Sequence, residues 1–135
     1  MIIGIIDSGI DPTHPDLSQF PGHDYVYDDI IPSDSLGHGT ACAGVAAGIA
    51  NNTKGVAGAA GGVSVMALRG FCCASGTIPF TNISNCITYG TTHGAKVLSM
   101  SFSFGWAFYA ATVERQRRLG AERVPAPTHG EAIAP

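Results

Sequence analysis

The chain begins with a short, almost wholly apolar run, Met1 to Ile6, which ends at Asp7, Ser8 and Gly9. A run of this length without polar alternation is typical of a strand buried on both faces, as in a parallel sheet. Two later segments, Val63 to Leu68 and Lys96 to Phe102, have the same apolar character and are predicted to be strands of that sheet.

Two helices are predicted among these strands. His38 to Ala50 consists of small apolar residues and fits a buried helix that ends at the two following asparagines, while Thr81 to His93 carries apolar residues on one helical face. Residues 10–37 are rich in turn formers and predict loops, with one short strand around Tyr25 to Tyr27. The alternation predicts an α/β fold in three layers, a mostly parallel sheet covered by helices on both faces.

Composition limits the partners. The 135 residues suffice for one core, and a net charge of −3 with only seven Lys and Arg gives no basic surface for nucleic acid. No apolar run reaches the roughly 20 residues of a membrane span, and the start lacks the charged region of a signal peptide. We therefore expect neither nucleic-acid nor membrane binding.

Residues 106–135 differ from residues 1–105, because they hold all three glutamates and four of the seven basic residues, whereas every aspartate lies at or before Asp34. We interpret residues 1–105 as one structural unit and residues 106–135 as a divergent tail, partly helical or disordered.

The four cysteines are too few and too unevenly spaced to indicate a disulfide framework. They carry no CxxC pair, which disfavours zinc binding by Cys72, Cys73, Cys86 and His93. We expect packed thiols, with a Cys73–Cys86 bridge as the open alternative.

Asp7 and His38 are the residues best placed for chemistry. Asp7 follows a buried strand, and ligands collect at the carboxyl ends of strands in open α/β sheets. His38 lies between two glycines at the start of the predicted helix. A carboxylate that holds Nδ1 of a histidine fixes the tautomer and leaves Nε2 to accept a proton. Taken singly, Asp7 could be a turn or helix cap and His38 a loop residue.

Two segments that contain these residues, IIDSGIDPTHPDL and GHGTACAGVAAG, resemble the aspartate and histidine signatures of the subtilisin family of serine proteases. NNTKGVAGAA and GAKVLSMSFSFG continue the resemblance, which runs from Met1 to about Gly105. It implies the N-terminal portion of a subtilisin-like fold and therefore an incomplete catalytic domain. Because proteases of this family are usually secreted, the resemblance also implies an extracellular protein.

The resemblance also implies roles for single residues. Asp7 would orient His38, the general base and later the acid. Ser101, Phe102 and Ser103 match the edge segment that pairs with an extended polypeptide substrate, and Ser75 with Gly76 matches the opposite wall of the groove. No cofactor is implied for the chemistry. Asp16 and Asn52, with the carbonyls of residues 50, 54 and 56, match a structural calcium site. Cys42 resembles a thiol beneath the histidine, and we expect it to be buried and inert.

The nucleophile of that family is missing, because no serine follows Ser103 and no asparagine for an oxyanion hole follows Asn85. We expect this chain to be inactive alone, with the C-terminal half of the catalytic domain as its missing partner. Two alternatives stay open: a small dimeric aspartic protease that uses Asp7, Ser8 and Gly9, and a noncatalytic pseudoprotease or peptide-binding module.

Overall fold

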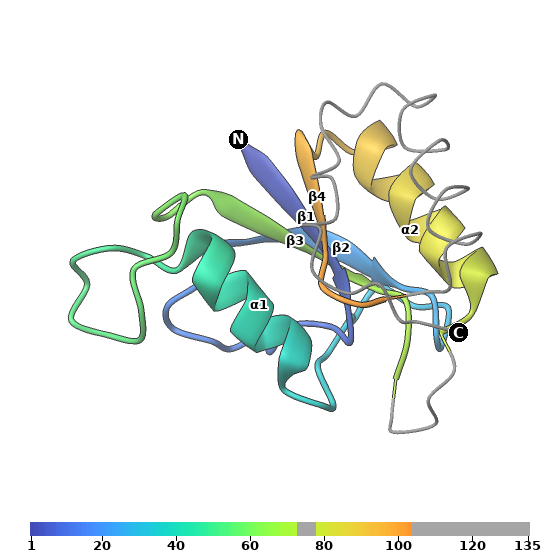
Figure 1. Cartoon of the computed structure of the whole chain (residues 1–135), viewed down its shortest axis with the longest axis horizontal. Helices are drawn as coiled ribbons and strands as arrows, with labels where there is room; N and C mark the ends of the chain where they lie inside the picture. The colour runs from blue at the N-terminus through green and yellow to red at the C-terminus, as the bar shows by residue number, and fades with distance from the viewer. Residues whose placement is uncertain (73–77, 104–135) are drawn as a thin grey trace, which may run out of the picture.

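The computed structural model describes residues 1–72 and 78–103, and their elements follow one another in alternating order (Figure 1). They are β1 (Ile2–Asp7), β2 (Gln19–Asp24), α1 (His38–Ala47), β3 (Ser64–Arg69), α2 (Phe80–Thr92) and β4 (Val97–Met100). No helix within these residues has the length and apolar character needed to cross a membrane.

The strands form one parallel sheet in the order β2-β3-β1-β4. Strand β1 is central: Ile2 is opposite Ser64 of β3, and Ile3 is opposite Val97 of β4. Helix α1 covers one face and α2 the other, as Figure 1 shows. The predicted three-layer α/β fold is confirmed.

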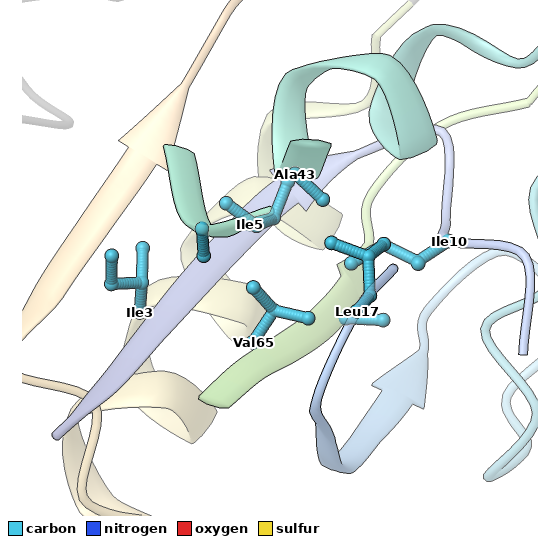
Figure 2. Close-up of a cluster of buried hydrophobic side chains, with 8 residues drawn as sticks. Ile3, Ile5, Ile10, Leu17, Ala43 and Val65 are labelled. Carbon is cyan, nitrogen blue, oxygen red and sulfur yellow. The ribbon is translucent and has the colours of Figure 1, made fainter. Parts of the chain in front are cut away.

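Side chains alternate between the two faces of the sheet and build two cores. Ile3 and Ile5 of β1 pack on the α1 side with Val65 and Ala43 (Figure 2). Ile6 lies on the α2 side. The residues of α2 that pack there are those expected from its periodicity, Ile83, Cys86 and Ile87, while Gly90 is buried on the same face.

Three elements differ from expectation, the first being β4, which ends at Met100 and not at Phe102. Helix α1 ends at Ala47 and not at Ala50, because Gly48 turns to an extended conformation while its N–H still bonds the Gly44 carbonyl. The strand expected at Tyr25 to Tyr27 was wrong: β2 ends at Asp24, whose carboxylate accepts the N–H groups of Val26 and Tyr27 and so folds that segment into a turn. The tail 106–135 lies outside the described residues.

Candidate active site

Asp7 is the last residue of β1 and is fully buried on the α1 side of the sheet. The loop after β1 packs on the α1 side through Ile10 and Leu17, while the segment after β3 packs on the α2 side through Phe71. Adjacent strands whose connections leave toward opposite faces open a crevice at their carboxyl ends, where ligands bind in α/β sheets. Asp7 therefore lies at the carboxyl edge of the sheet, at the position where α/β sheets bind their ligands.

His38 is the first residue of α1 and meets Asp7 directly. Its Nδ1 lies 2.7 Å from Asp7 Oδ1. Asp7 is buried, but half of the His38 side chain, 51 %, is exposed, so the ring can still reach a substrate. Because Nδ1 is held by the carboxylate, Nε2 is the nitrogen left to exchange protons.

The Asp7 carboxylate is oriented but not saturated. Its Oδ1 also accepts the Ser8 N–H at 2.7 Å. Its Oδ2 is buried and has no hydrogen-bond partner among the described residues. A buried charged oxygen of this kind is costly to leave unpaired, which is typical of a functional rather than a structural carboxylate.

Gly39 sets how closely α1 approaches β1. A side chain at this position would collide with the Gly9 carbonyl oxygen and come within 3.1 Å of Asp7 Cβ. Only glycine leaves room for that approach. A glycine is thus needed at position 39 because any larger residue would keep α1, and with it His38, farther from Asp7.

Asp34, which is not among the predicted site residues, binds the first turn of α1. Its carboxylate accepts the N–H groups of Leu36, Gly37 and Thr40 and the hydroxyls of Thr40 and Ser8. Burial alone would raise the pKa of Asp34, but these hydrogen bonds, chiefly from Thr40, lower its pKa to about 2. The signal in the sequence was an aspartate shortly before a helix start, which is the usual capping chemistry.

This lowered pKa predicts acid sensitivity. The bonds to Asp34 stabilise the fold fully above its ordinary pKa of 3.8, and this contribution is lost as the pH falls toward about 2. We expect Asp34→Asn to be less stable than the wild type at pH 5, and the difference in the free energy of unfolding to shrink as the pH falls from 4 to about 2. Urea denaturation at several pH values measures it, and a difference that does not change with pH would contradict the assignment.

Cys42 lies one helical turn after His38, with Sγ 3.9 Å from each ring nitrogen. It is half-buried, not fully buried as expected. Ligand atoms of Asp7, His38 and Cys42 lie within 4.8 Å of one another. Asp7 and His38 are already bonded to each other, so we assign no metal here.

The expected substrate-binding residues follow β4. Ser101 and Ser103 are exposed, and Phe102 between them is half-buried, with its ring edge-on to that of Phe71 at 5.5 Å between centroids. The other expected wall, Ser75 and Gly76, lies outside the described residues.

The structure brings Asp16 and Asn52 together, as expected for the predicted calcium site. The groups that contact the Asp16 carboxylate, however, are N–H donors. Asn52 Nδ2 donates to Asp16 Oδ1 at 2.6 Å, and Val56 N donates to Asp16 Oδ2 at 2.9 Å. The amide oxygen of Asn52 accepts the Lys54 N–H. Calcium needs six to eight converging oxygens. As they lie, these side chains close the loop by hydrogen bonds.

Removal of divalent cations therefore tests this loop. We expect EDTA to leave the Tm of the chain unchanged, because N–H donors already hold the buried Asp16 carboxylate. Asp16→Ala should lower the Tm by several degrees, since it leaves those donors without an acceptor. Thermal unfolding followed by circular dichroism measures both, and a fall in Tm with EDTA that added calcium reverses would show that the ion is bound.

A buried ion pair lies beside the site. Arg69, the last residue of β3, is in register with Asp7 on one side and Asp24 on the other. Arg69 Nη1 donates to Asp24 Oδ2 at 2.8 Å, and Nη2 donates to Ser35 Oγ at 3.0 Å. The guanidinium also lies over the Tyr27 ring, 5.0 Å from its centroid. The ends of β2 and β3 thus contact the segment that leads to His38.

A buried carboxylate that bonds Nδ1 of a half-exposed histidine, at the carboxyl edge of a parallel α/β sheet, has the geometry of the aspartate–histidine part of a catalytic triad. The subtilase family (peptidase S8) matches residues 1–125. Thermitase of Thermoactinomyces vulgaris is 44 % identical over 73 % of this chain and 36 % of its own length. Subtilisin DY of Bacillus licheniformis is 37 % identical over 73 % of the chain and 35 % of its own length.

A solved structure of a cold-adapted subtilisin-like serine proteinase shares the fold, with a TM-score of 0.66 at 18 % identity, covering 87 % of this chain and 42 % of that one. The chain belongs to the subtilase family of serine proteases. It spans about a third of the length of thermitase and subtilisin DY.

Proposed function

We propose that this chain supplies the aspartate and histidine of the catalytic triad of a serine endopeptidase. The observation that carries the proposal is the 2.7 Å contact between the buried Asp7 carboxylate and Nδ1 of the half-exposed His38. Acyl transfer needs this combination, since the carboxylate must be fixed while the imidazole reaches both nucleophile and leaving group.

In this mechanism His38 Nε2 takes the proton of a serine hydroxyl as the serine oxygen attacks the scissile carbonyl carbon. Asp7 stabilises the imidazolium that forms, and the imidazolium then protonates the leaving amine. In deacylation, His38 takes a proton from a water molecule as the water oxygen attacks the acyl carbon, and the imidazolium then protonates the departing serine oxygen. No residue of this sequence is assigned as nucleophile or oxyanion donor, because no serine follows Ser103 and no asparagine follows Asn85. We propose that the 135-residue polypeptide does not cleave peptides alone.

The substrate in this proposal is an extended polypeptide chain. Strand β4 has β1 on one side and no strand on the other among the described residues. The exposed Ser101 and Ser103 continue that edge, where backbone groups can pair with a substrate strand. An extracellular place of action is part of the proposal and rests on family membership alone.

A chimera tests the proposal. The part of this chain that matches thermitase, 73 % of its length at 44 % identity over 101 aligned residues, would replace the corresponding segment of thermitase. We expect the chimera to hydrolyse a chromogenic peptide, a serine-directed inhibitor to stop it, and the 135-residue chain to release no product.

Other outcomes identify the alternatives. Cleavage by the 135-residue chain that pepstatin inhibits would indicate an aspartic protease built from Asp7, Ser8 and Gly9. Peptide binding by the folded chimera without cleavage would indicate a pseudoprotease or peptide-binding module.

A further inference from the structure

The segment between β2 and α1 contains Asp34, whose carboxylate bonds both to the loop after Asp7 and to the first turn of α1. Asp34 Oδ1 accepts the hydroxyl of Ser8 at 2.8 Å, and Ser8 directly follows Asp7. Asp34 Oδ2 accepts the Thr40 N–H at 2.9 Å and the Thr40 hydroxyl, and Thr40 lies in the first turn of α1 behind His38. Asp34 therefore links the residue after Asp7 to the turn that carries His38.

Ser8 completes the link. Its buried hydroxyl donates to Asp34 and accepts the Gly39 N–H at 3.0 Å, while its own N–H donates to Asp7 Oδ1. The hydroxyl thus joins the loop after β1 to the residue next to His38. Through Ser8 and Thr40, Asp34 adds to the contacts that hold α1 against β1 and its following loop, which include the bond from the Asp11 N–H to the Thr40 hydroxyl and the close approach of Gly39 to the Gly9 carbonyl.

The start of α1 needs this carboxylate because its own N-cap offers none. The N-cap is Gly37, in a left-handed conformation with φ 81° and without a side-chain cap. The first N–H groups of a helix need acceptors. Asp34 accepts from Gly37 and Thr40, and Ser8 accepts from Gly39. The helix start that presents His38 is thus held by side chains from outside the helix.

We propose that Asp34 is a positioning residue for the Asp7–His38 pair, acting through Ser8 and the first turn of α1. This inference rests on the proposed function. Both carboxylate oxygens are required, because each accepts at least two donors. Asparagine would turn an NH₂ group toward N–H donors on one side.

Nuclear magnetic resonance of the ¹⁵N-labelled 135-residue chain tests the inference without an activity assay. The His38 Nδ1 proton bonded to Asp7 gives a strongly downfield resonance, and its exchange with water reports how constantly the bond is made. We expect Asp34→Ala to speed this exchange at least tenfold, and Ser8→Ala to speed it less. Asp29→Ala is the matched control, because Asp29 makes the same kind of loop bond, to the Ile31 N–H, on an exposed surface. The control should stay within twofold of the wild type.

The outcomes are separable when each variant is measured in the cold, where circular dichroism shows it to be folded. Wild-type exchange in both Asp34→Ala and Ser8→Ala, whatever their Tm, would overturn the positioning role and leave the Asp7–His38 pair intact. If Asp34→Ala does not fold, the result for Ser8→Ala decides. A wild-type chain with no protected Nδ1 proton would overturn the pair itself, and both proposals with it.

Discussion

Asp7→Asn in the thermitase chimera is expected to lower kcat for peptide hydrolysis about 10⁴-fold and to change KM little. The carboxylate at 2.7 Å from His38 Nδ1 accepts the ring proton and stabilises the imidazolium of the transition state. A carboxamide carries no charge, and its NH₂ group can hold the ring in the tautomer that has its proton on Nε2. Nε2 then cannot act as a base, while peptide binding along β4 is untouched. Steady-state kinetics with a chromogenic peptide separates the two constants.

The chain offers a matched control in a second histidine–aspartate pair. Asp28 Oδ1 lies 3.3 Å from His23 Nε2, and the Asp28 side chain is 91 % exposed. Asp28→Asn makes the same chemical change in a solvated pair, which contributes little, and should alter kcat less than twofold. A fall in kcat below tenfold for Asp7→Asn would contradict the role assigned to Asp7.

Arg69→Met is expected to lower the free energy of unfolding of the chain by about 3–5 kcal/mol, the usual cost of leaving one partner of a buried ion pair alone. Arg69 and Asp24 are both almost completely buried, and Arg69 Nη1 donates to Asp24 at 2.8 Å. Methionine keeps much of the length of the stem but leaves the Asp24 charge without its cation. The variant also loses the bond to Ser35, so the loop before α1 loses an anchor. Urea denaturation followed by circular dichroism gives the difference.

Two further variants show whether the loss of stability comes from the unpaired Asp24 carboxylate or from the loss of a positive charge in general. Lys96→Met removes a cation from an exposed position and should cost less than about 0.5 kcal/mol. Arg69→Met combined with Asp24→Leu removes both charges and should recover part of the loss, because the buried carboxylate is gone. A loss below about 1 kcal/mol in Arg69→Met would show that the pair behaves as a solvated one.

The elements that could be predicted from the sequence are those whose pattern reports burial directly. The run from Met1 to Ile6 has no polar face, so it indicated a strand buried on both faces, and the spacing of Ile83, Cys86 and Ile87 indicated the buried face of α2. Strand β2 was misplaced because its sequence, with Pro21 and Gly22 at the bulge, has little strand preference. Its position depends on pairing with β3.

The site was predictable only in part, for a physical reason. Asp7 and His38 lie far apart in the sequence, and the resemblance to a family brought them together before the structure did. Asp34 lies shortly before a helix start, where an aspartate often caps, but nothing local indicated that its carboxylate also accepts the hydroxyl of the distant Ser8. The Asp24–Arg69 pair likewise depends on strand register, which single segments do not encode.

The central place of β1 has a consequence for biosynthesis. Ile2 pairs with Ser64 and Ile3 with Val97, so both neighbours of β1 come much later in the chain. Until the ribosome has added β3 and β4, the apolar strand β1 has no partner strand and can aggregate with other nascent chains. Loop-closure entropy must be lost before the strands gain from pairing, which makes folding slower than in chains whose contacts are local. Chaperone supply during translation is therefore expected to govern the yield of soluble chain.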